Sequence, residues 1–125
     1  METKITISEL KAEILRVKSI DAGWSKDPEH NYPKSQLPKV YLVGHVGQKT
    51  HLCVARLNIT STGKLEINFP SANCGSNRYN TRGVSVNQIT GTQTVTCKKC
   101  GAGEVDLDKM NEKYSHLFDM IGKTI

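Results

Sequence analysis

The chain has 125 residues, of which 37% are hydrophobic and 23% are charged, and its formal net charge at pH 7 is +5. This size predicts a single globular domain, residues 1–125, with a modest hydrophobic core. No stretch approaches the roughly 18 apolar residues of a membrane-spanning helix, and the charged N-terminal segment lacks the apolar centre of a secretion signal. We therefore expect a cytoplasmic protein without a membrane partner, in a compartment where cysteines bind metal or stay reduced more often than they form disulfides.

Positive charge is concentrated in the middle of the chain. Residues 39–103 contain eight Lys and Arg residues but a single acidic residue, Glu66, whereas the two flanking segments together are slightly acidic. A segregated positive segment is typical of proteins that bind a polyanion. The alternative is a basic face that contacts only solvent, and the charge pattern is equally consistent with it.

Residues 6–20 have the pattern of an amphipathic helix. Thr6 and Glu9 have the spacing of a capping box, in which each side chain accepts a hydrogen bond from the other residue's backbone N–H. Apolar residues then recur at intervals of three and four, as expected for a helix that faces a core: Ile7, Leu10, Ile14 and Val17. The proline-containing segment 21–38 follows, and we expect an ordered loop held by Trp24 and Tyr32.

Five short runs rich in β-branched and aromatic residues predict a small β-region. They span residues 39–46, 50–59, 64–69, 83–90 and 93–97. Because the connections between most of them are too short for helical crossovers, we expect about five mostly antiparallel strands in one sheet. The exception is the long polar loop from Phe69 to Gly83.

The C-terminal segment 106–121 carries a helical stripe of apolar residues and ends before Gly122, a typical helix stop. The stripe consists of Leu107, Met110, Tyr114, Leu117 and Ile121. The expected fold class is therefore α+β, with an N-terminal helix, a small sheet and a C-terminal helix.

Cys97 and Cys100 are separated by two residues, the spacing at which one tight turn offers two thiolates to a tetrahedral Zn²⁺. Cys74, which precedes a glycine in the long loop, is a natural third ligand. The fourth is either Cys53 or His51, which lie two residues apart and therefore on the same face of one predicted strand. The alternatives are a redox pair and cysteines without a chemical role; a thioredoxin-type pair, however, opens a helix, whereas this pair ends a β-run.

These motifs resemble those of small zinc-knuckle proteins of bacteriophages and mobile elements. The matching pieces lie within residues 50–103: Thr50-His51-Leu52, Asn73-Cys74-Gly75 and Val95-Thr96-Cys97-Lys98-Lys99-Cys100. The resemblance implies a zinc-stapled β-region, residues 39–103, in which His51, Cys74, Cys97 and Cys100 are the ligands. The chain departs from that pattern by offering Cys53 as well, and by a longer stretch between His51 and Cys74. If the chain is phage-encoded, its compartment is the host cytoplasm.

No enzymatic motif is present in the sequence. Zinc deaminases combine His-x-Glu with Pro-Cys-x-x-Cys, but none of the four histidines is followed by Glu at that spacing, and Thr96 precedes Cys97. His-Glu-x-x-His, Gly-x-Ser-x-Gly and phosphate-binding loops are also missing. We therefore expect a binding protein rather than an enzyme.

The basic middle segment supplies the candidate binding residues. The stretch Ser76–Gly83 places Arg78, Tyr79 and Arg82 in one glycine-bounded loop, a mixture that contacts phosphates and stacks on bases. Lys98 and Lys99 lie between the two knuckle cysteines. We expect these five residues to bind nucleic acid. The alternative partner is a host nucleic-acid-handling or defence protein, which the chain would inhibit.

Overall fold

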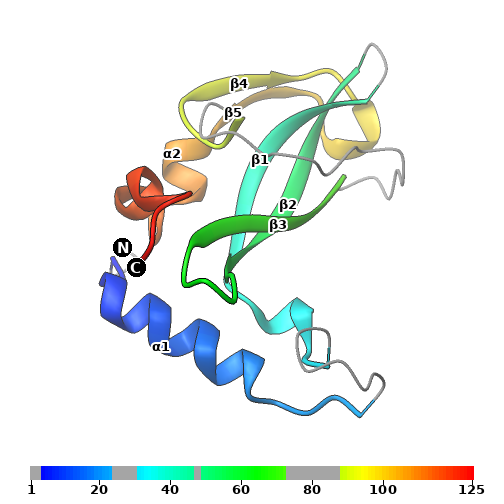
Figure 1. The fold of residues 1–125 in the computed structure, drawn as a ribbon. Helices are drawn as coiled ribbons and strands as arrows, with labels where there is room; N and C mark the ends of the chain where they lie inside the picture. Colours follow the sequence, from blue (N-terminus) through cyan, green and yellow to red (C-terminus); the bar gives the residue numbers. More distant parts are fainter. Residues whose placement is uncertain (1–3, 24–30, 47–48, 73–87) are drawn as a thin grey trace.

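The computed structural model describes residues 4–23, 31–46, 49–72 and 88–125, and its fold is α+β. The described strands form a three-stranded antiparallel sheet, in the order β1–β2–β3, and a separate antiparallel pair, β4–β5 (Figure 1). Their bounds are Lys39–Val46 (β1), Lys49–Ile59 (β2), Leu65–Ala72 (β3), Thr92–Val95 (β4) and Gly103–Asp106 (β5). The prediction of one sheet with about five strands is therefore wrong in its arrangement, because the described strands divide between two sheets.

The N-terminal helix α1, Ile7–Lys18, forms as the sequence predicts. Thr6 is its N-cap, and the reciprocal hydrogen bonds of the capping box with Glu9 are both present. Leu10, Ile14 and Val17 are buried on one face of the helix, where they join the side chains of the three-stranded sheet in the larger of two hydrophobic clusters. The periodicity of the sequence therefore identified the packed face correctly.

Strand β2 is the centre of the larger sheet and pairs with both β1 and β3. Every second side chain from His51 to Leu57 is buried, as expected for a strand with one face in the core. The pairing with β3 shifts between Val54 and Arg56, which marks a β-bulge. Beyond this shift, the end of β3 runs beside the half of β2 that contains Cys53.

The two sheets have separate hydrophobic clusters. The larger one lies between the three-stranded sheet and α1 and contains sixteen of the described residues, among them Tyr32, which lies shortly before the 3-10 helix η1, Lys34–Gln36. The smaller one joins Val43 of β1 to Val95, Cys97, Cys100 and Leu107. Both predicted knuckle cysteines therefore lie where the small sheet packs on the large one. Trp24 lies outside the described residues.

Two other predicted segments differ from the structure. Of the run 83–90, residues 88–90 are not a strand, and residues 83–87 lie outside the described part of the chain. Strand β5 was not predicted, because the strand has only four residues, is largely exposed and includes two acidic side chains. It forms because it continues from the knuckle and pairs antiparallel with β4. No described helix has the length and apolarity needed to cross a lipid bilayer.

The prediction of a single C-terminal helix over residues 106–121 is wrong. The structure contains α2, Leu107–Met110, then a turn, and then the 3-10 helix η4, Ser115–Met120. The helix ends at Asn111, whose buried side chain bonds to the backbone of β1 instead of facing solvent. Its Oδ1 accepts from the N–H of Tyr41 (2.7 Å), and its Nδ2 donates to the carbonyls of Tyr41 (2.9 Å) and Ile89 (3.2 Å). This tertiary contact overrides the local helical pattern.

Replacing Asn111 with Ala should destabilise the protein by about 2 kcal/mol or more, because the change leaves backbone groups of Tyr41 without their partner. Urea unfolding of the full-length protein measures the effect. Lys109→Ala, an exposed change on α2, should alter the free energy of unfolding by less than about 0.5 kcal/mol. An Asn111→Ala variant as stable as this control would show that the side chain does not tie α2 to β1.

Candidate metal centre

The knuckle that contains Cys97 and Cys100 connects the two strands of the small sheet. Val95 at the end of β4 pairs with Gly103 at the start of β5, so the residues between them form a closed turn. Lys98–Cys100 is a 3-10 helix, η3, and the backbone N–H of Cys100 donates to the carbonyl of Cys97 (3.2 Å). Gly101 ends it with φ of 91°, a left-handed conformation that favours glycine. The glycine after the second cysteine is thus required by the turn.

Strand β2 brings His51 to this knuckle from a distant part of the sequence. The Nδ1 atom of His51 lies 3.4 Å from the Sγ atom of Cys100. The potential ligand atoms of His51, Cys97 and Cys100 all lie within 4.8 Å of one another. The three side chains are 5–6% exposed. They form a buried cluster that can hold a metal ion.

Two threonines hold the two halves of the cluster together. Thr50 precedes His51 and Thr96 precedes Cys97, and each backbone N–H donates to the other residue's hydroxyl oxygen (2.8 Å in both cases). The carbonyl of Thr50 also accepts from the backbone N–H of Cys97 (3.0 Å), and its hydroxyl donates to the carbonyl of Thr94 (2.7 Å). These bonds fix the position of the knuckle on β2, independently of any metal.

Cys53 is not part of this cluster. It is fully buried in the larger hydrophobic cluster, paired across the sheet with Leu42 and Ala72, and its Sγ lies 3.6 Å from the carbonyl oxygen of His51. Of the two alternatives left open by the sequence, His51 is the one that the structure places at the knuckle. The third predicted cysteine, Cys74, lies outside the described residues.

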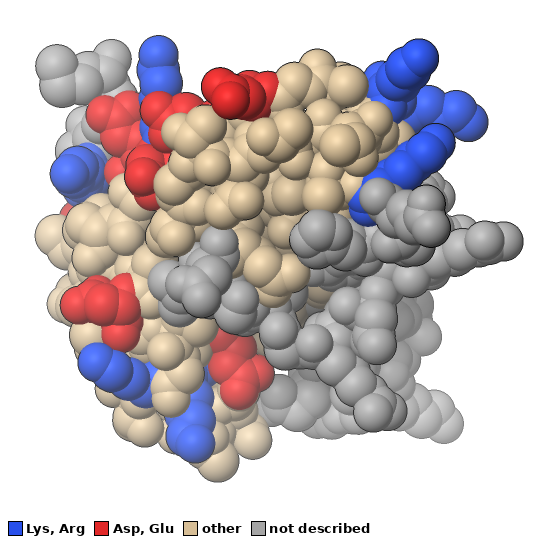
Figure 2. Space-filling model, turned by 90° about the horizontal axis from the view of Figure 1, so that it is seen from above, with Lys and Arg blue, Asp and Glu red and all other residues tan. Residues whose placement is uncertain are grey.

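A hollow of about 470 Å³ opens beside the cluster. It is lined by Lys49, His51, Thr96, Cys97, Lys98 and Lys99. The three lysines are exposed, and Lys and Arg side chains gather on the right of the view from above (Figure 2), the side on which the knuckle lies in Figure 1. The predicted binding residues Lys98 and Lys99 therefore lie at this hollow. The other three, Arg78, Tyr79 and Arg82, are outside the described residues.

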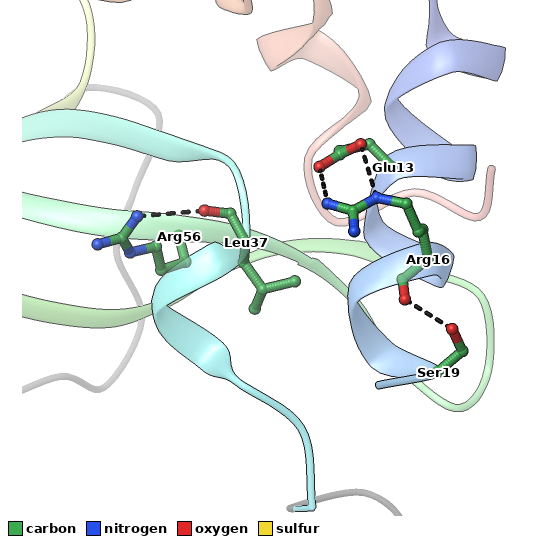
Figure 3. Close-up of polar contacts among 5 residues, drawn as sticks. All are labelled: Glu13, Arg16, Ser19, Leu37 and Arg56. Carbon is green, nitrogen blue, oxygen red and sulfur yellow. Dashed lines mark hydrogen bonds and ion pairs between the residues drawn. The ribbon is translucent and has the colours of Figure 1, made fainter. Parts of the chain in front are cut away.

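Other basic side chains are engaged far from the hollow. Arg56 donates to the carbonyl of Leu37 (3.2 Å) and thereby ties the residues just before β1 to β2 (Figure 3). On α1, Arg16 forms an exposed ion pair with Glu13 (2.8 Å), and this hydrogen bond holds the pKa of Glu13 below its usual value. Arg56 and Arg16 thus have local structural partners, whereas the lysines at the hollow form no ion pair with another described residue.

No known protein family, curated protein or solved structure matches the chain. The chemistry of the site is therefore inferred from its own residues. Lys49, Thr50 and Thr96 had no predicted role at the site. The signal for the two threonines was their position, since each directly precedes a ligand candidate, and polar residues beside ligands often orient them.

Replacing Cys100 with Ala should abolish metal binding, whereas Cys53→Ala should retain it, because only Cys100 belongs to the cluster. The probe is Co²⁺, whose thiolate charge-transfer absorption reports binding to cysteine; we expect about one equivalent per chain in the wild type and in Cys53→Ala. Circular dichroism verifies that both variants fold. Equal loss of Co²⁺ in the two variants, or no Co²⁺ binding by the wild type, would contradict this assignment.

Proposed function

We propose that the chain is a small zinc-stabilised binding protein that binds nucleic acid through its basic central region. The observation that carries the proposal is the contact between a buried His/Cys cluster and a hollow lined by three lysines. Thiolate and imidazole are the ligands that structural zinc sites use. The proposal has two parts, the metal and the ligand, and each has its own support.

The spacing of the cluster supports zinc. Two ligands of a tetrahedral zinc ion, one sulfur and one nitrogen, are expected about 3.5 Å apart, given bond lengths of about 2.3 and 2.0 Å. The separation of 3.4 Å between His51 Nδ1 and Cys100 Sγ is close to this value. A metal on Nδ1 places the imidazole proton on Nε2, which fixes the tautomer.

Cys74 is the fourth ligand in this proposal. The last residue of β3, Ala72, pairs with Cys53, which lies two residues from His51 on β2. Cys74 follows Ala72 by two residues in the sequence, and two residues of chain span at most about 7 Å. Three thiolates and one imidazole would complete a closed site of the structural kind, with no position left open for a reacting molecule. This favours a binding protein over an enzyme.

The zinc ion would supply a cross-link. It would connect the start of β2, the segment after β3 and the knuckle between β4 and β5. A structural zinc site contributes its binding energy to folding, which matters in a chain with a modest core. The metal would therefore add stability to the fold that carries the basic surface.

Charge supports nucleic acid as the ligand. Residues 39–103 contain eight basic residues and one acidic residue, and three of the lysines line one hollow. Lysine and arginine that neutralise phosphates account for most sequence-independent affinity for nucleic acid. Arg78 and Arg82 would add phosphate contacts, and Tyr79 would add a stacking platform.

The wild-type protein should bind mixed single- and double-stranded oligonucleotides in fluorescence anisotropy, with log affinity falling linearly with log salt concentration. Arg78→Ala with Arg82→Ala should lower that slope by about 0.7–0.9 for each lost phosphate contact. Tyr79→Ala should cost roughly 1–3 kcal/mol per stacked base on single strands, with little change in slope. Arg16→Ala, on α1, is the matched control and should leave binding unchanged.

Absence of binding at low salt would contradict the nucleic-acid proposal. The protein partner would then be the better hypothesis: a host nucleic-acid-handling or defence complex, captured from host lysate equally well with and without nuclease treatment. Capture that nuclease abolishes would support nucleic acid instead.

A further inference from the structure

The hollow beside the metal cluster gathers three lysines from two distant segments. Lys49 is the first residue of β2, while Lys98 and Lys99 lie in the knuckle. The reciprocal hydrogen bonds between Thr50 and Thr96 join these two segments next to the lysines. The positions of the backbone around the hollow are therefore fixed before any ligand arrives, which reduces the entropic cost of binding.

Among the described residues, no carboxylate balances the charge of these lysines in an ion pair. Within the described ranges, none of the three forms an ion pair; the ion pair found there joins Arg16 to Glu13. Glu66, the single acidic residue of the middle segment, lies on β3 opposite Asn58, near the end of β2 that is farther from the hollow. Glu104 on β5 is exposed and forms no ion pair with them either. The hollow is therefore a place where an anion would be stabilised.

The proposed metal centre would account for only part of this positive charge. A zinc ion held by three thiolates and one neutral imidazole would have one net negative charge, which a single lysine would balance. Two lysine charges would remain. A phosphomonoester carries a charge of about −1.5 to −2 at neutral pH, whereas a phosphodiester within a strand carries about −1. The charge count thus favours a terminal phosphate over an internal one.

We infer that this hollow binds a phosphomonoester, the terminal phosphate of a nucleic-acid strand, through Lys49, Lys98 and Lys99. Its volume of about 470 Å³ lies in the range of small-ligand pockets and accommodates a terminal nucleotide. Lysine binds phosphate as a point charge and does not require the fixed geometry of arginine. The inference deepens the proposed function and rests on it for the source of the phosphate.

The test compares single-stranded oligonucleotides of about ten nucleotides that differ only in a terminal phosphate or hydroxyl. In fluorescence anisotropy with the full-length, metal-loaded protein, we expect the terminal phosphate to tighten binding about tenfold. Lys49→Gln, which lies outside the knuckle, should remove this preference, as should Lys98→Gln with Lys99→Gln. Lys123→Gln is the matched control, because Lys123 is exposed but does not line the hollow, and this variant should keep the preference for a terminal phosphate. Metal content verifies that each variant retains its centre.

Inorganic phosphate and a mononucleotide serve as competitors and as separate ligands. If either binds through the same lysines without any preference for strand ends, the hollow is a phosphate site whose source is a small molecule, and the phosphate chemistry is supported. The inference would be overturned if oligonucleotides that end in phosphate and in hydroxyl bind with equal affinity and neither competitor binds. That result would leave nucleic-acid binding intact. Binding of the mononucleotide without binding of any oligonucleotide would support the hollow and contradict the proposed function.

Discussion

The contact between the start of β2 and the knuckle is the constraint on which the rest of the structure depends. Residues 46 positions apart in the chain, Thr50 and Thr96, share two short hydrogen bonds there. Because each threonine is bonded covalently to a member of the His/Cys cluster, this contact sets His51 against Cys97 and Cys100. The same contact brings three lysines to the rim of one hollow. The His/Cys cluster and the basic surface therefore share one structural origin.

The small sheet is held on the large one at two points. At the hairpin end of β1 and β2, the threonine contact and the His/Cys cluster make the connection. Toward the other end of β1, Asn111 bonds to both backbone groups of Tyr41. Between these points lies a hydrophobic cluster in which five of the described residues are buried, two of them the knuckle cysteines. A core of this size contributes little stability by itself, so polar contacts and a metal are suited to hold it.

The sequence was sufficient where local patterns and tertiary packing agree. The capping box and the apolar stripe of α1 predict a helix that the structure contains, and the β-branched runs predict β1 and β2. It was insufficient where a distant contact decides the outcome. The apolar stripe at the C-terminus favours one helix, but Asn111 reaches the backbone of β1 and ends it. Short, acidic β5 is a strand only because the knuckle delivers it to β4.

The candidate site divides in the same way. The spacing of Cys97 and Cys100 marks a ligand pair in the sequence, and the structure brings both into one cluster. The choice between His51 and Cys53 is different, since both side chains lie on one face of β2. Only the docking of the knuckle on Thr50 shows that the cluster forms at the end of the strand, with His51, while Cys53 packs in the core.

X-ray absorption at the zinc edge, on protein purified without added metal, tests this account most directly. The account predicts about one zinc ion per chain, with three sulfur ligands at about 2.3 Å and one nitrogen ligand at about 2.0 Å. A site of four sulfurs would mean that Cys53 replaces His51 and that the cluster is assigned wrongly. A first shell dominated by oxygen, or protein without bound zinc, would contradict the proposal that zinc stabilises the fold.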